Sequence, residues 1–298
     1  MVDLRALIAE ERTAAEGSSA EAYAALLQRR LASRPIVLDT ELLERTIVRK
    51  SWADALREVV GPLLVQTAAC PEALVLVNTY PRVPTAAAET ILIQELGLQR
   101  DTLHSSNAGF DQCFDRIVAI RAFRPRTLVR GHVVASVRVR AYLELLGVRP
   151  IVLVRDIFDT IASYADDRTD RPIAPGYQLA SRSPAERRRI QALRMAPQLV
   201  DFYASWMGAQ ADGRCTVHRW EDVRQDWPGF IVDRLAEHGR TVDRESIAER
   251  LATMPTQAHS TPGQGATLSD EDRALVRSLY VQYPHLDFRP IDADAPSA

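Results

Sequence analysis

Three residues with chemically useful side chains, Arg82, His132 and Arg155, each stand shortly after a run of hydrophobic residues. Ser163 follows Arg155 by about two helical turns. A guanidinium presents a fork of N–H donors to an oxyanion, and a histidine that titrates near neutrality can take a proton from a hydroxyl. This combination predicts a site that binds an anionic group and moves a proton.

The hydrophobic runs that precede these residues read as buried strands, each leading into a helix. We predict strands at 73–78, 127–130 and 150–154, and helices at 84–96, 135–146 and 156–165. Repeated strand-helix-strand units imply an α/β fold with a parallel sheet and right-handed crossovers. The carboxyl ends of such strands meet at one edge of the sheet, where α/β proteins bind nucleotides.

The remainder of the chain is mostly helical by the spacing of its hydrophobic residues. We predict a long helix at 185–207, a last strand at 215–220, helices at 227–238 and 244–252, a helix to 280 capped at Ser269, and a frayed tail at 291–298. The domain division is a helical N-terminal extension at 1–70 and an α/β domain at 71–298. The extension could pack on the core, form a face between two copies in a homodimer, or cover a binding pocket.

Charge and composition exclude several classes of protein. The 298 residues include 37 basic and 39 acidic side chains, which argues against bulk nucleic-acid binding and against a polybasic membrane anchor. The N-terminus lacks a signal-peptide layout, and no apolar run approaches the roughly 18 residues of a transmembrane segment. The three cysteines are far apart, without a C-x-x-C pair, so we expect reduced thiols, no zinc site and a cytoplasmic protein.

The stretches around Arg82, His132 and Arg155, in this order, resemble the sulfotransferases that use PAPS (3'-phosphoadenosine-5'-phosphosulfate). Residues 79–85 resemble the family's T-Y-P-[K/R]-S-G-T-T-W loop, and residues 130–132 its Lys/Arg-x-His group. Residues 155–163 resemble its R-[D/N]-x-x-D-x-x-x-S segment. The resemblance spans roughly residues 72 to 290, and it implies a parallel sheet flanked by helices, similar to the P-loop NTPases.

The resemblance also implies a role for each matching residue. Arg82 and Thr85 would hold the 5'-phosphosulfate, with Arg82 also stabilising charge during transfer, and His132 would be the general base. Arg155 and Ser163 would bind the 3'-phosphate. The implied activity is transfer of a sulfuryl group from PAPS to a hydroxyl of a small molecule, lipid or glycan, without a metal. By general rules, Asp156 caps the following helix and Asp159 interacts with its dipole.

Two further residues match weaker parts of the family pattern. Trp220 stands where the family supplies an adenine contact, although a core tryptophan is an equally good interpretation. Gly263 lies in residues 259–265, the counterpart of the family's Arg-Lys-Gly-x-x-Gly loop, which grips the 3'-phosphate. The basic pair is missing here. Either another arginine replaces it (Arg171, Arg182 or one of residues 187–189), or the donor binds weakly.

The 5'-phosphosulfate loop departs from the pattern too, and other functions therefore stay open. Val83 and Pro84 replace Ser-Gly, and Ala86 and Ala87 replace Thr-Trp, which removes an N–H donor and limits the approach of the backbone to a phosphate. The alternatives are an enzyme on the same fold with an altered donor, or a non-catalytic nucleotide-binding or interaction protein. A P-loop kinase is disfavoured because the chain has no G-x-x-x-x-G-K-[ST]. The acceptor's identity does not follow from the sequence, since acceptor pockets are built from loops.

Overall fold

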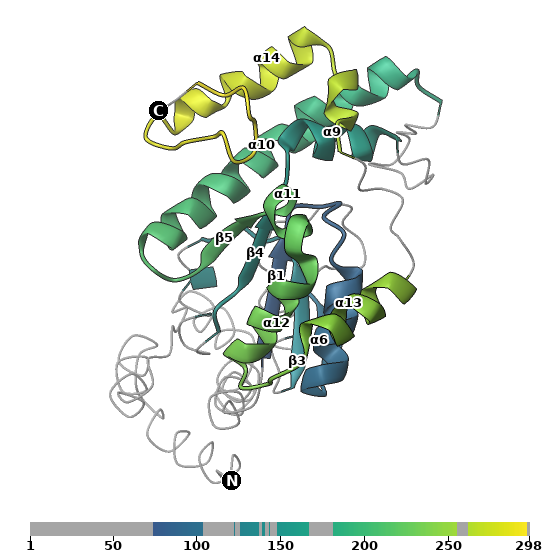
Figure 1. Ribbon diagram of the computed structural model, residues 1–298. Helices are drawn as coiled ribbons and strands as arrows, with labels where there is room; N and C mark the ends of the chain where they lie inside the picture. Colours follow the sequence, from purple (N-terminus) through teal and green to yellow (C-terminus); the bar gives the residue numbers. More distant parts are fainter. Residues whose placement is uncertain are drawn as a thin grey trace, which may run out of the picture.

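The computed structural model describes residues 74–103, 122, 126–136, 139–140, 143, 148–166, 181–254 and 262–296. The predicted helical extension at 1–70 lies outside these residues, and the helix predicted at 135–146 lies mostly outside them. Within the described part, a five-stranded sheet is flanked by helices (Figure 1). The predicted α/β class is confirmed.

The sheet is parallel throughout, in the order β2-β3-β1-β4-β5. Its strands are β1 (Leu74–Thr79), β2 (Gln99–Thr102), β3 (Thr127–Gly131), β4 (Ile151–Val154) and β5 (Thr216–Arg219). Every residue of β1 and β4 is buried, which fits the continuous hydrophobic runs expected of strands covered on both faces. The sequence did not predict β2, because its residues are polar and largely exposed at the edge of the sheet.

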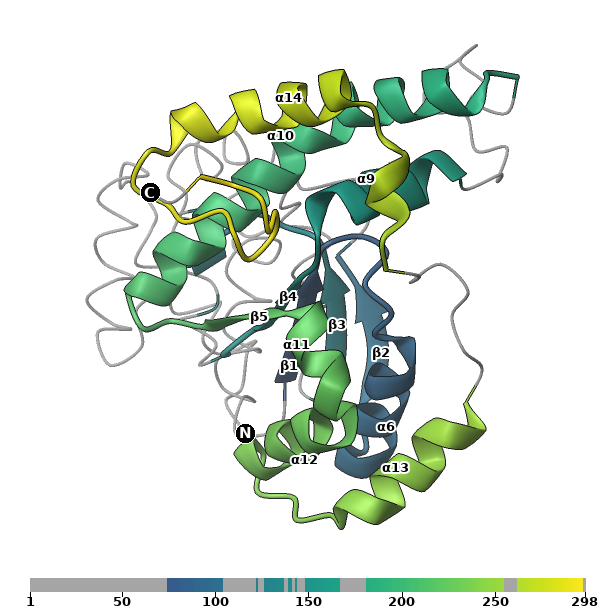
Figure 2. The same ribbon diagram turned by 45° about the horizontal axis from the view of Figure 1, so that its top comes forward.

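Helices cover the sheet in two groups. The α-helices are α6 (Ala86–Leu96), α9 (Ile157–Asp166), α10 (Pro184–Ala211), α11 (Trp220–Val223), α12 (Trp227–Glu237), α13 (Arg244–Thr253) and α14 (Asp270–Ser278), and the 3₁₀ turns are η1 (Arg224–Asp226), η2 (Gln264–Thr267) and η3 (Tyr280–Gln282). Helices α6, α12 and α13 pack together, whereas α10 packs on both α9 and α14 (Figure 2). Among the described helices, none has the length and apolar character that crossing a bilayer requires.

Local signals set the starts of several helices. Ser183 and Glu186 form a reciprocal capping box at the start of α10, and Ser269 accepts a hydrogen bond from the Asp272 amide at the start of α14, as predicted. Helix α6 begins later than predicted, at Ala86 with Thr85 as its N-cap. Pro84 therefore precedes the helix instead of occupying its first turn.

The C-terminal tail is not frayed between residues 291 and 296, so that prediction was wrong. Ile291 is buried, and its carbonyl accepts a 2.8 Å hydrogen bond from the Ile157 amide at the start of α9. Asp292 is buried too, and Arg277 Nε donates to its carboxylate at 2.8 Å. A hydrophobic side chain and a paired carboxylate hold the tail against the domain that carries the predicted site.

Candidate active site

Arg82, His132 and Arg155 lie at the same edge of the sheet, where the parallel strands end. Gly131, Thr79 and Val154 end the adjacent strands β3, β1 and β4, and His132, Arg82 and Arg155 follow within three residues of those ends. Arg155 Nη1 donates a 3.1 Å hydrogen bond to the Arg82 carbonyl. The strand order therefore brings together segments that are more than 70 residues apart in the chain.

His132 is buried and its ring has a defined orientation. Its Nδ1 lies 2.6 Å from the Thr79 carbonyl oxygen at the end of β1. A carbonyl oxygen only accepts hydrogen bonds, so Nδ1 carries the proton, and the neutral ring has its lone pair on Nε2. This tautomer can accept a proton at Nε2, as a general base must.

Asn78 fixes the backbone beside His132, and the sequence analysis missed it. Its side-chain amide donates to the Val133 carbonyl and accepts from the Val133 amide, both at 2.9 Å. Asn78 is fully buried, where such a side chain is stable only when its hydrogen bonds are made. A polar residue at the end of an otherwise hydrophobic strand was the signal that could have identified it.

Arg82 occupies a tight turn and leans on helix α9. Its φ of 66° is in the left-handed region, which is uncommon for residues other than glycine. Its guanidinium lies over the Tyr164 ring, 4.8 Å from the centroid, a cation–π contact with the residue after Ser163. The turn therefore directs the Arg82 side chain toward the helix that carries Ser163.

Thr85 is already engaged by a carboxylate that the sequence analysis did not identify. Its Oγ1 donates a 2.5 Å hydrogen bond to Oε1 of Glu89, which is buried in the first turn of α6. The Arg130 and Arg100 guanidiniums lie 3.7 and 3.5 Å from the same carboxylate. A hydroxyl has one proton to give, so in this arrangement Thr85 does not donate to an anionic ligand.

Arg155 is a buried cation that fits an anionic ligand. Its guanidinium lies 3.5 Å from the Asp159 carboxylate, and its side chain is 1% exposed. Burial lowers the pKa of Arg155, although the charge of Asp159 acts in the opposite direction. Its Nε has no hydrogen-bond partner among the described residues. Because a desolvated guanidinium with a spare donor is stabilised by an oxyanion, this residue suits a phosphate.

Asp159 links the start of α9 to the glycine loop that leads into η2. Its two carboxylate oxygens accept hydrogen bonds from the backbone amides of Gly263 and Gly265, at 2.9 and 2.6 Å. Gly265 packs so closely that an added Cβ would lie 2.6 Å from the Phe158 Cβ. Asp159 thus does more than interact with a helix dipole: it holds in place the loop predicted to grip the 3'-phosphate.

Asp156 caps α9, as predicted, and carries a perturbed carboxyl group. Its Oδ1 accepts from the Asp159 amide at 2.8 Å. Burial raises the pKa of Asp156 to about 6; the Asp159 amide opposes this shift, and the nearby carboxylates of Asp159 and Glu221 add to it. The Asp156 amide donates to Glu221 at 3.0 Å, which ties α9 to the short helix α11.

Ser163 and Trp220 lie on elements that reach the same edge. Ser163 is buried on α9, the helix that follows Arg155. Trp220 begins α11 directly after β5, and it packs edge-on against Trp227 with ring centroids 5.0 Å apart. Both the core role and the adenine-contact role proposed for Trp220 are compatible with this buried position.

Two arginines contact η2, the turn that contains Gly265, and one of them was not expected from the sequence. Arg188 Nη1 donates to the Thr267 carbonyl at 3.4 Å, and Arg273 Nη2, which the sequence analysis missed, donates to the Gly265 carbonyl at 2.7 Å. Arg182 pairs with Glu186, and Arg189 contacts Asp272 at 2.9 Å. Arg171 lies outside the described residues. Within the described ranges, no cluster of His, Cys, Asp and Glu has the makeup of a metal site.

Comparison with solved structures identifies the architecture. The model aligns with the crystal structure of mouse sulfotransferase SULT7A1 complexed with PAP, with a TM-score of 0.51 and 11% identity, over 76% of this chain and 91% of that chain. The chain adopts the sulfotransferase fold. The fold expected from the sequence motifs is therefore confirmed.

Other comparisons add little to this likeness. Retinol dehydratase in complex with androsterone and inactive cofactor PAP aligns over 72% of this chain and 74% of that chain at 17% identity, but its TM-score of 0.41 is too low to support an inference. The sequence matches no family model and no curated protein. At such low identity the structural likeness establishes the fold alone, so the roles of individual residues rest on their geometry.

Proposed function

We propose that this sulfotransferase-fold protein transfers a sulfuryl group from PAPS to a hydroxyl of a small molecule, lipid or glycan. One observation carries the proposal: a buried arginine, a second arginine and a histidine whose Nδ1 faces a carbonyl oxygen follow the ends of three adjacent parallel strands. Arg155 supports it most directly, because its spare donor and its desolvated charge suit a phosphate. PAPS would supply the sulfuryl group and a phosphate leaving group.

In this proposal the side chains divide the work between binding and proton transfer. Arg155 and Ser163 bind the 3'-phosphate, Arg82 stabilises the negative charge on the 5' side, and Trp220 packs on the adenine. His132 accepts the acceptor's hydroxyl proton at Nε2, while the Thr79 carbonyl stabilises the resulting imidazolium through Nδ1. Positioning and charge stabilisation then account for most of the catalysis, as in phosphoryl transfer.

A second candidate, nucleotide binding with an altered donor or without catalysis, is favoured by different observations. The Thr85 hydroxyl already donates a hydrogen bond to Glu89, and the backbone amides of Gly263 and Gly265 already donate to Asp159. An anion that used these donors would have to displace a carboxylate. The Thr85 contact makes the 5' side less suited to a phosphosulfate, and the Asp159 contacts make the glycine loop less suited to gripping the 3'-phosphate.

Calorimetry with matched nucleotides tests the proposal. We expect adenosine 3',5'-bisphosphate to bind about 10- to 100-fold more tightly than adenosine 5'-monophosphate, because charge-assisted hydrogen bonds to the 3'-phosphate contribute about 1.5–3 kcal/mol. ATP with magnesium should bind more weakly than the bisphosphate. Equal affinity for the bisphosphate and the monophosphate would contradict the assignment of Arg155 and Ser163.

Variants and a transfer assay separate the two candidates. Arg155→Ala should weaken bisphosphate binding more than Arg82→Ala does, and Ser163→Ala offers a milder change if Arg155→Ala fails to fold. Labelled PAPS is then incubated with phenols, alcohols and sugars. Transfer to any hydroxyl supports the enzyme, whereas tight bisphosphate binding without transfer supports the non-catalytic candidate.

A further inference from the structure

The C-terminal tail, residues 288–296, returns to the start of helix α9. After α14 and η3 the chain turns back toward α9 (Figure 1, Figure 2). The Ile291 carbonyl accepts a 2.8 Å hydrogen bond from the amide of Ile157, the first residue of α9. The first amides of a helix have no partner within the helix, so a buried one needs an acceptor from elsewhere. Ile157 is fully buried, and the tail supplies that acceptor.

A buried carboxylate fixes the tail in this position. Asp292, the residue after Ile291, is 2% exposed. Arg277 on α14 donates to both of its carboxylate oxygens, from Nε at 2.8 Å and from Nη2 at 3.0 Å. The Tyr280 hydroxyl donates to the same carboxylate at 3.3 Å. Because a buried carboxylate is stable only with its partners, these hydrogen bonds hold the tail against α14 and α9.

The same arginine also contacts Phe158, the second residue of α9. The Arg277 guanidinium lies 5.4 Å from the Phe158 ring centroid, and the Arg273 guanidinium, one turn earlier on α14, lies 4.7 Å from it. Phe158 is 2% exposed. Arg273 also donates to the Gly265 carbonyl at 2.7 Å. Two cation–π contacts on one buried ring therefore join α14, the start of α9 and the glycine loop.

This part of α9 adjoins the residues assigned to the 3'-phosphate. Arg155 stands just before the helix and Asp159 lies in its first turn, with 3.5 Å between the guanidinium and the carboxylate. Asp159 in turn holds the glycine loop through the amides of Gly263 and Gly265. Release of the tail would free the first turn of α9, and the positions of Arg155 and the glycine loop depend on that turn.

We propose that the docked C-terminal tail positions Arg155 and the glycine loop for the 3'-phosphate of a nucleotide; this rests on the proposed function, which assigns Arg155 and Ser163 to that phosphate. Tail docking and nucleotide binding are then linked, and the linkage is reciprocal. The docked tail tightens binding, and the bound nucleotide holds the tail. Asp292 and Arg277 act through α9, so they are positioning residues.

Hydrogen exchange on the ligand-free full chain tests whether the tail holds the start of α9. Asp292→Asn keeps the size of the side chain but removes its charge and one of the two acceptors for Arg277. We expect the amides of Ile157 and of the glycine loop to exchange about tenfold faster in this variant. The control is Ile247→Val, which leaves a small cavity behind α13. It should lower the melting temperature without this local increase in exchange.

Calorimetry tests whether the tail affects the nucleotide. Wild type should bind adenosine 3',5'-bisphosphate more tightly than adenosine 5'-monophosphate. Asp292→Asn should reduce this affinity ratio about tenfold and leave the affinity for the monophosphate unchanged, because only the 3'-phosphate depends on Arg155. Ile247→Val should keep the wild-type ratio. If Asp292→Asn fails to fold, Tyr280→Phe, which removes one hydrogen bond to Asp292, should reduce the ratio about two- to threefold.

The outcomes separate the role of the tail from the proposed function. Equal affinity of wild type for the two nucleotides would overturn both, because there would be no 3'-phosphate site to position. A wild type that prefers the bisphosphate, together with an Asp292→Asn variant that keeps the full preference, would overturn the role of the tail alone. Exchange at Ile157 that is unchanged in Asp292→Asn, or equally fast in Ile247→Val, would do the same.

Discussion

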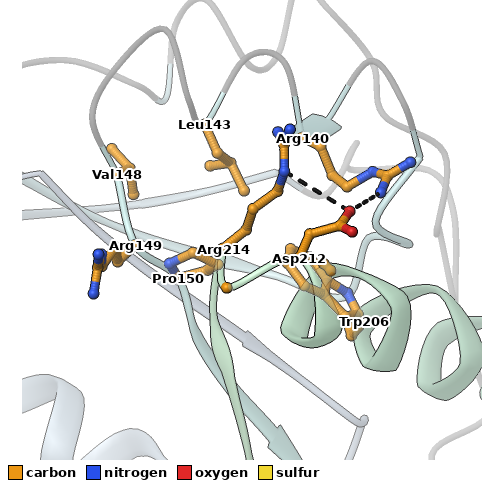
Figure 3. Close-up of a pocket in the computed structure, with 10 residues that line it drawn as sticks. Arg140, Leu143, Val148, Arg149, Pro150, Trp206, Asp212 and Arg214 are labelled. Atoms are coloured by element: carbon orange, nitrogen blue, oxygen red, sulfur yellow. Dashed lines mark hydrogen bonds and ion pairs between the residues drawn. The ribbon is translucent and has the colours of Figure 1, made fainter.

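An arginine–aspartate pair lies at each end of the parallel strands, and the two pairs differ in burial. At the carboxyl edge, the Arg155 and Asp159 side chains are 1% and 7% exposed. At the amino edge, the Arg140 and Asp212 side chains are 29% and 51% exposed (Figure 3). The same two residue types therefore form a desolvated pair in one place and a solvent-screened pair in the other.

Burial decides what each pair can do. A buried pair is held by the free-energy penalty of separating its charges, so it fixes geometry and preorganises a site for charge stabilisation. An exposed pair contributes little to stability and can exchange partners. The pair Arg155–Asp159 is accordingly suited to holding a fixed geometry, whereas the pair Arg140–Asp212 can rearrange.

The largest expected effect tests whether the residues at the carboxyl ends of the strands carry out catalysis. His132→Ala should lower kcat by about 10²–10⁴-fold, because the proton acceptor is lost, and should leave affinity for adenosine 3',5'-bisphosphate nearly unchanged. The measurements are turnover with labelled PAPS and calorimetry. His285→Ala, at an exposed histidine, is the control. Near-normal turnover in His132→Ala would make His132 structural.

A paired set of substitutions compares the two aspartates directly. Asp159→Asn should lower the free energy of unfolding by about 3–5 kcal/mol, since it leaves Arg155 buried without its counter-charge and turns an amide NH₂ toward one of the glycine N–H groups. Asp212→Asn should change it by no more than about 1 kcal/mol. Urea denaturation measures both. Similar free energies of unfolding for the two variants would show that the difference in burial between the two pairs does not affect stability.

Two glycine substitutions should change the free energy of unfolding in opposite directions. Gly265→Ala should destabilise the protein by about 1–3 kcal/mol, because its Cβ would lie 2.9 Å from the Asp159 amide nitrogen as well as against Phe158. Gly208→Ala, in helix α10 with no atom near the added Cβ, should stabilise it by about 0.5–1 kcal/mol. Thermal and urea unfolding check both signs. A harmless Gly265→Ala would mean that the loop is not tightly packed on α9.

The last expected effect is a change in the pH dependence of stability. Burial raises the pKa of Asp156 to about 6, so its protonated form stabilises the folded state below about pH 4, and this contribution is lost as the pH rises to about 6. Asp156→Asn keeps the capping oxygen and removes the titration. Relative to wild type, the variant should gain about 2–3 kcal/mol between pH 4 and 7, because the pKa rises from 3.8 to about 6 on folding.

The control for this measurement is Asp222→Asn at an exposed position. Its difference from wild type should stay constant across the same pH range. A flat difference for Asp156→Asn as well would show that its carboxyl group is not desolvated in the folded protein.

Hydrophobic runs and capping residues were enough to predict most of the elements. Strands β1, β3 and β4 were found because buried parallel strands are continuous runs of Val, Ile and Leu, and Ser269 was recognised as an N-cap from its local sequence. The polar edge strand β2 has no such signal. The prediction of a frayed tail was wrong because the pairing of Asp292 with Arg277 joins two separate segments, and a local sequence pattern does not reveal it.

For the candidate site, the sequence by itself determined which residues follow the strand ends: Arg82, His132 and Arg155. Only the tertiary structure decided their surroundings. The strand order sets β3 and β4 on either side of β1, Asn78 holds the backbone after His132, and Asp159 reaches amides more than 100 residues away. Short sequence patterns report the backbone preferences of neighbouring residues, whereas burial and hydrogen bonding between distant segments are fixed when the whole chain packs.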